Sequence, residues 1–398
     1  MPGPQQPPAA HAPGWLTNAD CRVAELAALA DTATDPADTP HARAVVDNVP
    51  VYDGDALRAQ LGDAMHRRAI QAELARTLMD GPGIIVLQRA FADPAVVEHA
   101  TAAFFALIAE QHARGDASGD HFARPGANDR VWNALEKLGV RQPAVFVDYY
   151  ANDLLALVCE AWLGPHYQVT SQVNVVNPGG AAQSMHRDYH LGFMADATAA
   201  RYPAHVHRLS PVLTLQGAVA HGDMPVESGP TLYLPHSQKL AAGYLGWPRA
   251  DFQALFAARR VQLPLASGDA VFFNPALYHA AGHNRNGHVR RMANLLQVSS
   301  AFGRAMESVD RERLSNAVFP ALCAARDSGR LTPEQVRHAI AATAEGYAFP
   351  TNLDRDQPLD GLAPPSQAQV VAQAVDERWP PAQLRAALRA HRLRRLTD

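Results

Sequence analysis

Cysteine is scarce in this chain of 398 residues, and the few cysteines show no pairing. Cys21, Cys159 and Cys323 lie far apart, without the short spacings of a thiolate zinc site or the density of a disulfide scaffold. Disulfide-stabilised secreted folds and cysteine-based metal sites are therefore not expected. The pattern favours a reducing compartment, and we expect a cytoplasmic protein.

A strong charge and a long hydrophobic run are also missing. The formal net charge is −4, and basic residues gather only near the end, between Arg389 and Arg395, so nucleic-acid binding has little support. No apolar stretch approaches the roughly 20 residues of a membrane-spanning helix, and the start is proline-rich where a signal peptide would be basic and then apolar. We expect neither a nucleic-acid partner nor a membrane partner.

The residues that are present have the composition of a folded globular protein, because 47% are hydrophobic and only 19% are charged. Helical periodicity predicts helices at 55–79 and 144–162, and a β-branched run predicts a strand at 84–87. Further on, short apolar segments separated by turn residues favour a sandwich or barrel: 167–176, 212–219, 231–234, 270–273 and 292–299. The sequence predicts a mainly β fold with flanking helices.

Three regions are expected along the chain. Residues 1–54 read as an N-terminal tail, partly disordered, because Met1–Pro13 mixes proline, glutamine and alanine. Residues 55–303 hold the predicted strands with supporting helices. Residues 304–398 return to a helical pattern, with a capping box at Thr332–Gln335 and a basic amphipathic ending. This helical extension is expected to pack against the strands or to form a homodimer contact.

Two His-x-Asp tripeptides are candidates for a metal-ligand pair. His186 and Asp188 follow a predicted strand and a Pro-Gly-Gly turn, and alternation along an extended chain sends both side chains to one side. His221 and Asp223 lie before another strand, where a turn aspartate commonly accepts local backbone hydrogen bonds. Either tripeptide alone is weak evidence, since a chain with 18 histidines contains such matches by chance.

A third ligand is expected where the strand after Gly268-Asp269 ends in His279. Two imidazoles and a carboxylate can hold Fe(II) by one face and leave the opposite face open. His283 and His288 compete for this role, but both lie in a polar loop and are expected to be exposed. Arg290, beside its neighbour Arg291, opens the strand that follows, where a guanidinium can bind a carboxylate in two-pronged fashion.

The chain resembles the phytanoyl-CoA dioxygenase-like branch of the Fe(II)/2-oxoglutarate oxygenases over about residues 80–302. Each motif is modest, but their order and spacing together are specific. The resemblance rests on four ordered pieces: Gln183-x-x-His186-x-Asp188, the Ser-Gly-Pro-Thr segment 228–237, Gly268-Asp269 leading to His279-x-x-Gly-x-Asn284, and Arg290.

The resemblance implies a double-stranded β-helix, a jelly roll of the cupin type, buttressed by N-terminal helices. Fe(II) would bind His186, Asp188 and His279, and these three would also be the catalytic residues, with dioxygen as the co-reactant. The family order selects this pair over His221 and Asp223. The cosubstrate 2-oxoglutarate would be held by residues at three matching positions: Gln183, Thr231 and Arg290. Arg291 is the alternative to Arg290 if the spacing from His279 differs by one residue from that of the family.

Two departures from the family pattern stand out. The usual Pro-Gly-Ser-His reads Pro235-His-Ser-Gln238, and a small hydroxyl residue often found two positions after the distal histidine is Ala281 here. The second change could alter how the cosubstrate carboxylate is seated. Related halogenases have a small residue where this chain has Asp188, so halogenation is not expected.

The resulting expectation is a 2-oxoglutarate-dependent dioxygenase that hydroxylates a C–H bond of a small metabolite and releases succinate and carbon dioxide. One alternative keeps the metal but not the cosubstrate, giving a cupin-like metalloenzyme in which Arg290 binds the substrate. Another is a non-enzymatic binding or assembly protein on the same scaffold. The sequence does not identify the substrate, and nothing in it resembles a dedicated coenzyme A site.

Overall fold

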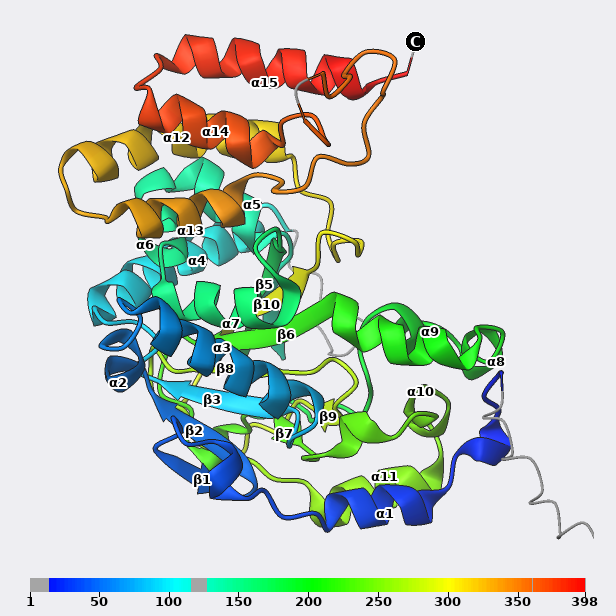
Figure 1. Ribbon diagram of the computed structural model, residues 1–398. Helices are drawn as coiled ribbons and strands as arrows, with labels where there is room; N and C mark the ends of the chain where they lie inside the picture. Colours follow the sequence, from blue (N-terminus) through cyan, green and yellow to red (C-terminus); the bar gives the residue numbers. More distant parts are fainter. Residues whose placement is uncertain (1–13, 116–126, 360, 398) are drawn as a thin grey trace, which may run out of the picture.

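The computed structural model describes residues 14–115, 127–359 and 361–397 (Figure 1). The tail expected at Met1–Pro13 lies outside the described residues. Within them the chain forms a mixed α and β structure, in which helices occupy more residues than strands. The expectation of a mainly β fold is therefore corrected, because helices flank the strands at both ends of the chain and also fill the connections between them.

An eight-stranded sheet forms the centre of the molecule, in the order β1-β2-β3-β8-β6-β10-β5-β4, and β7 pairs with β9 in a second sheet. All strand pairs of the large sheet are antiparallel except β2 with β3, which is parallel. The strands are β1 (Ala44–Val46), β2 (Val49–Asp53), β3 (Ile84–Gln88), β4 (Asn128–Val131), β5 (Gln168–Val176), β6 (Thr214–Ala220), β7 (Leu232–Tyr233), β8 (Ala270–Phe273), β9 (His279–Ala280) and β10 (Arg291–Ser299).

The large sheet has two chemically different faces. On β5, Val173 and Val175 belong to the apolar core shared with the helices. Their neighbours Gln172 and Asn174 line a cavity on the other side. Alternate residues of a strand point to opposite faces, so the polar alternation of β5 marks the cavity face directly.

The second sheet packs against the cavity face. Tyr233 on β7 contacts Phe273 on β8 with ring centroids 5.1 Å apart, and His279 on β9 lies 4.8 Å from the same ring. Isolated backbone bridges widen this layer, one between His186 and His279 and one between Tyr233 and Val261. The cavity therefore lies between two layers of extended chain.

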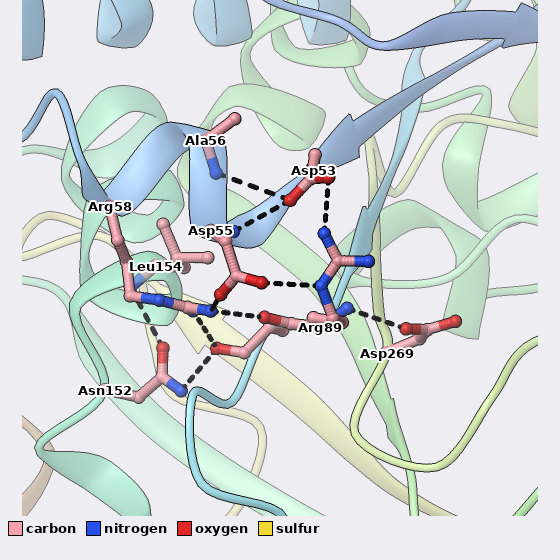
Figure 2. A network of polar contacts seen from close by, with 9 residues as sticks. Asp53, Asp55, Ala56, Arg58, Arg89, Asn152, Leu154 and Asp269 are labelled. Atoms are coloured by element: carbon pink, nitrogen blue, oxygen red, sulfur yellow. Dashed lines mark hydrogen bonds and ion pairs between the residues drawn. The ribbon is translucent and has the colours of Figure 1, made fainter.

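Residues 44–53 belong to the sheet, although the sequence assigned them to the N-terminal tail. β2 pairs with β3 from Val51 to Asp53. Figure 2 shows the polar network at this junction, where Arg89 pairs with Asp53 and, at 2.7 Å, with Asp55. The amide of Arg89 donates to Asp269 at 2.8 Å. Asp269, in the Gly-Asp motif, therefore has a structural role, because it joins the end of β3 to the start of β8.

The helices are α1 (Val23–Ala30), α2 (Gly54–Arg58), α3 (Ala64–Met79), α4 (Pro94–Ala113), α5 (Ala134–Arg141), α6 (Pro143–Tyr150), α7 (Asp153–Leu163), α8 (Asp196–Ala199), α9 (Ala204–Leu209), α10 (Gly243–Gly246), α11 (Ala250–Arg259), α12 (Arg311–Asp327), α13 (Pro333–Thr343), α14 (Gln367–Asp376) and α15 (Pro381–Arg395). Two predicted helices are each divided in two. Asp63 caps α3 and Asn152 caps α7 by accepting backbone hydrogen bonds, which starts a new helix at each point.

The helices α12 to α15 stack at one end of the molecule, with α12 against α5 and α6 (Figure 1). Thr332 and Gln335 form the expected capping box of α13. Arg311 on α12 is buried and donates to the carbonyls of Ala342, at 2.7 Å, and Val169, at 2.6 Å. These bonds tie the C-terminal helices to the sheet. A homodimer through these helices stays a prediction. None of the described helices is long and apolar enough to cross a membrane.

A buried polar network lies between the sheet and the helices. His221 is 6% exposed, and its ring nitrogens contact the hydroxyls of Thr101 at 2.8 Å and Tyr149 at 2.9 Å. Asn294 on β10 donates to the same Tyr149 hydroxyl at 3.2 Å. Burial lowers the pKa of His221 from 6.5 to about 3. The folded protein therefore keeps this imidazole neutral.

The His221→Gln variant should show a weaker loss of stability in mild acid than the wild type. Below about pH 6.5 the unfolded chain binds a proton at His221, whereas the folded chain binds it only near pH 3. The free energy of unfolding therefore falls as the pH falls from about 6.5 to about 3. The slope from this residue is about 1.4 kcal/mol per pH unit. Urea unfolding across this range measures it, and equal slopes in the two proteins would contradict the assignment.

Candidate metal centre

The three predicted metal ligands meet at the edge of the second sheet. His279 is the first residue of β9. Its backbone amide donates to the carbonyl of His186 at 3.2 Å, and its carbonyl accepts from the amide of His186 at 3.0 Å. Asp188 follows, and its amide donates to the carbonyl of Pro275 at 3.3 Å. After it the chain turns sharply, because Tyr189 and His190 have φ angles of 62° and 40°. Such positive φ values are strained for residues other than glycine and occur at functional sites.

The ligand atoms of the three side chains converge. Nε2 of His186 lies 3.7 Å from Oδ1 of Asp188, and Nε2 of His279 lies 3.3 Å from Oδ2. One ligand atom from each residue lies within 4.8 Å of the other two. Ligands about 2.1 Å from one ion and at right angles to each other lie about 3 Å apart. The arrangement therefore fits a single ion after a small closing movement.

Both imidazoles are oriented by backbone carbonyls. Nδ1 of His186 lies 2.8 Å from the carbonyl of Ser184, and Nδ1 of His279 lies 2.9 Å from that of Leu277. A carbonyl can only accept, so each Nδ1 carries the proton and each Nε2 presents a lone pair toward Asp188. Burial and the nearby His279 lower the pKa of His186, which keeps this imidazole in the neutral form that binds metals.

Asp188 remains a carboxylate inside the protein. Its burial acts to raise the pKa, but contacts with His279, His186 and Gln216 outweigh that effect and lower the pKa below the usual range. The Gln216 amide donates to Oδ2 at 2.5 Å. Gln216 on β6 was not predicted from the sequence; its place among the cavity-facing residues of the strand is the signal that could have found it.

The competing candidates lie elsewhere. His221 points into the buried network behind the sheet, and Asp223 accepts a hydrogen bond from the amide of Ser267 at 3.0 Å, as expected for a turn aspartate. His283 and His288 are exposed. The motif residue Asn284 is fully buried and donates to the carbonyls of Val176, at 3.0 Å, and Val289, at 2.8 Å, so it holds the loop together.

Arg290 does not face the cavity. Its side chain is 47% exposed and bonds to Asp129 and Asn177, both at 3.1 Å. It also stacks over the ring of Phe105. The physical reason is strand alternation, which sends neighbouring residues to opposite faces. The next residue, Arg291, lies on the cavity side instead.

Arg291 lines the cavity and is only 7% exposed. It has no ion pair within the described part of the chain, and its Nη1 atom has no hydrogen-bond partner there. Burial lowers its pKa to about 10, although Tyr233 acts in the opposite direction, so it is still protonated at neutral pH. A buried cation without an anion is costly. This residue therefore fits a ligand that carries a carboxylate.

Gln183 and Thr231 also line the cavity. The amide of Gln183 donates to the carbonyl of Ala281 at 2.9 Å, and its side-chain Oε1 accepts from the amide of Ala281 at 3.3 Å. Ala281 lies in the cavity wall and lacks the hydroxyl often found at this position. The cavity has a volume of about 620 Å³, within the range of small-molecule sites.

Arg187 lies between two of the ligands and points the opposite way. It is 1% exposed, and its guanidinium is held 5.0 Å from the ring centroid of Tyr244 and 4.6 Å from that of Tyr278. It donates to the carbonyls of Ser237 at 2.6 Å and Leu240 at 3.2 Å. Gly243 is required beside it, because a Cβ atom there would overlap the guanidinium group. Arg187 therefore fixes the segment that carries His186 and Asp188.

Replacing Arg187 with methionine should weaken both the fold and the metal site. The loss of the aromatic contacts and carbonyl bonds should lower the free energy of unfolding by about 2–4 kcal/mol. Iron affinity should fall about tenfold because the ligand pair loses its anchor. Chemical denaturation and iron titration measure the two effects. Unchanged iron affinity in the folded variant would show that Arg187 is structural only.

Two imidazoles and a carboxylate that converge on one point are the ligand set of a non-haem Fe(II) oxygenase. The buried Arg291 beside them fits an acidic cosubstrate. Residues 61–292 match the family model described as Phytanoyl-CoA dioxygenase (PhyH). The match covers more than half of the chain, and the chain belongs to this family. It is accordingly a 2-oxoglutarate-dependent non-haem iron dioxygenase, with Fe(II) and 2-oxoglutarate as metal and cosubstrate.

Individual relatives are more distant. Dioxygenase trt7 of Aspergillus terreus (strain NIH 2624 / FGSC A1156) is 25% identical over 226 residues, which are 56% of this chain and 71% of the relative. Several solved structures are similar. One is the non-heme alpha ketoglutarate dependent epimerase SnoN from nogalamycin biosynthesis, with 18% identity over 60% of this chain and 84% of that chain and a TM-score of 0.37. Others are AviO1 from Streptomyces viridochromogenes Tue57 (21% identity, 60% of this chain and 97% of that chain, TM-score 0.42) and the carbocyclase SnoK from nogalamycin biosynthesis (18% identity, 61% of this chain and 88% of that chain, TM-score 0.38).

Proposed function

We propose that the protein hydroxylates a C–H bond of a small metabolite, and that the large and second sheets together form a double-stranded β-helix around the site. The observation that carries the proposal is Arg291, a buried guanidinium with no anionic partner among the described residues, in the same cavity as His186, Asp188 and His279. A dicarboxylate cosubstrate satisfies both features, because it offers one end to the metal and the other to the arginine.

The iron and 2-oxoglutarate supply the oxidising chemistry when bound: one atom of dioxygen enters succinate, carbon dioxide leaves, and the other oxygen converts a substrate C–H into C–OH. The protein holds the metal by one face through His186, Asp188 and His279. Arg291 binds the distal carboxylate, and Thr231 and Gln183 complete its surroundings. Because Asp188 occupies the third ligand position, no metal site is vacated for a halide.

The apolar part of the cavity excludes water from the reaction. Ile84 and Val86 on β3 and Val271 on β8 line it, together with Leu263. These side chains leave no polar group that could retain ordered water on that side. A dry wall protects an oxidising site from unproductive side reactions.

The direct test is 2-oxoglutarate turnover. With Fe(II), ascorbate and oxygen, the purified protein should convert 2-oxoglutarate to succinate in step with oxidation of a substrate from a broad metabolite panel. Omitting 2-oxoglutarate should stop the oxidation, which separates this proposal from the cosubstrate-independent alternative. Iron-loaded protein that never forms succinate across the panel would overturn the proposal.

A further inference from the structure

A row of side-chain amides lines the half of the cavity that faces β6, β10, β5 and β4. Its members are Gln216, Gln297, Gln172 and Asn174, and we call these four residues the amide row. Gln216 lies opposite Gln297 in the register of β6 and β10. On β5, Gln172 and Asn174 lie opposite the next two cavity-facing residues of β10, Leu295 and Ala293. The amides therefore follow a diagonal across three neighbouring strands.

Each member of the amide row has a polar atom that the described residues leave unsatisfied. The buried atoms without a hydrogen-bond partner among the described residues are Oε1 of Gln216, Oε1 of Gln297, Nε2 of Gln172 and Oδ1 of Asn174. Gln172, Gln216 and Gln297 are 2%, 6% and 8% exposed. Most buried polar groups in proteins have a partner, so four unsatisfied amides in one wall indicate that the partner is a ligand.

Two members of the amide row are held in place by hydrogen bonds, and the other two are not. Gln216 donates to the metal ligand Asp188 at 2.5 Å. On β5, Oε1 of Gln172 accepts a hydrogen bond from Arg130 of β4 at 3.0 Å. The side chains of Gln297 and Asn174 make no hydrogen bond to the described residues. These two amides are therefore available to a molecule that lies beside the metal.

The rest of the cavity limits the chemistry of that molecule. The wall formed by β3 and β8 is apolar, and the mouth carries three partly exposed apolar side chains: Trp132, Phe193 and Met306. Of the cationic side chains in the wall, Arg130 bonds to Gln172, and the proposed function assigns Arg291 to the cosubstrate. A positive charge on the substrate would be desolvated beside Arg130 and Arg291, and the carboxylate among the described lining residues, Asp188, is assigned to the metal.

We infer that the substrate is a neutral, oxygen-rich molecule with hydroxyl or carbonyl groups along one edge and an apolar face opposite. A carboxamide donates and accepts but carries no charge, so it pairs equally with hydroxyl and carbonyl oxygens. The edge with the oxygens lies on Gln297 and Asn174, and the apolar face lies on β3 and β8. This inference rests on the proposed function, since it assigns the same cavity to substrate.

Binding to the anaerobic protein loaded with Fe(II) and 2-oxoglutarate tests the inference. The probes are neutral compounds in pairs of one skeleton that differ only in hydroxyl groups, starting with hydrocortisone and progesterone, and cholic acid serves as an anionic probe. Across the pairs, the hydroxylated member should bind about tenfold more tightly by calorimetry. Gln297→Leu and Asn174→Leu should each remove most of that preference.

Two controls isolate the amide row. Leu295→Met changes a cavity residue between Gln297 and Ala293 without touching an amide, and Gln373→Leu makes the same chemical change on the exposed face of α14. Both should keep the wild-type preference. No preference in the wild type, tighter binding of the anionic probe, or a preference that survives both amide substitutions would overturn the inference. Iron and 2-oxoglutarate binding, measured in the same samples, shows separately whether the proposed function holds.

Discussion

Asp188→Ala should abolish specific Fe(II) binding and with it all 2-oxoglutarate turnover. The carboxylate supplies the anionic ligand of the site, and its oxygens lie 3.7 and 3.3 Å from the two imidazole nitrogens. Without it, two neutral imidazoles remain, and iron affinity should fall at least about 100-fold. Equilibrium dialysis against Fe(II) under anaerobic conditions measures the loss.

Asp223→Ala is the matched control, because it removes the aspartate of the other His-x-Asp tripeptide. Asp223 accepts a backbone hydrogen bond in a turn, away from the three metal ligands, so iron binding and turnover should stay at the wild-type level. Asp188→Asn adds a second test, since it keeps the size and the contact with Gln216 but removes the charge. If Asp223→Ala lost iron and Asp188→Ala kept it, the assignment of the metal to His186 and Asp188 would be wrong.

Arg291→Gln should weaken 2-oxoglutarate binding by about 100-fold or more, since losing one partner of a buried charge pair costs about 2–5 kcal/mol. The unliganded variant should be at least as stable as the wild type, because it no longer buries a cation that has no ion pair with any described residue. Thermal unfolding with and without 2-oxoglutarate measures both effects. The wild type should gain stability from the cosubstrate, and the variant should gain little at the same concentration.

Arg290→Gln provides the comparison one residue away. Its guanidinium pairs with Asp129, which does not line the cavity. Its 2-oxoglutarate affinity should therefore match that of the wild type. If Arg290→Gln lost the cosubstrate and Arg291→Gln kept it, the alternation of β10 would have been assigned in the wrong register.

The order of the motifs was enough to select the ligand pair from the sequence. His279 lies some 90 residues after His186 and Asp188, yet the structure brings the three together because β9 bridges the segment around His186. A single tripeptide could not have shown this. The position of the Gly-Asp motif before the distal histidine carried the information, although Asp269 itself turned out to secure the ends of two strands.

The choice between Arg290 and Arg291 needed the faces of β10. Met292, Leu296 and Val298 join the helix-side core, and this places Arg291, Ala293, Leu295 and Gln297 toward the cavity. The alternation was present in the sequence, but the family spacing outweighed it. The amides of β5, β6 and β10 were missed for a related reason: a polar residue on a strand is normally solvent-facing, and only a second layer of chain turns that face inward.

The ends of the elements were harder to predict. Asp63 and Asn152 divide two apparently continuous helices, because an aspartate or asparagine that accepts backbone hydrogen bonds starts a new helix. β1 and β2 were missed because they are short: β1 pairs only with β2 in the sheet, and β2 depends on pairing with β3, which is distant in the sequence.

The central claim is that His186, Asp188 and His279 hold one Fe(II) and that Arg291 holds the cosubstrate beside it. Anaerobic titration of the Fe(II)-loaded protein with 2-oxoglutarate, followed by visible absorption, tests it most directly, because a keto acid that chelates Fe(II) gives a charge-transfer band. The account predicts a band that saturates at one equivalent in the wild type and is absent in Asp188→Ala. Iron binding without any such band in the wild type would contradict it.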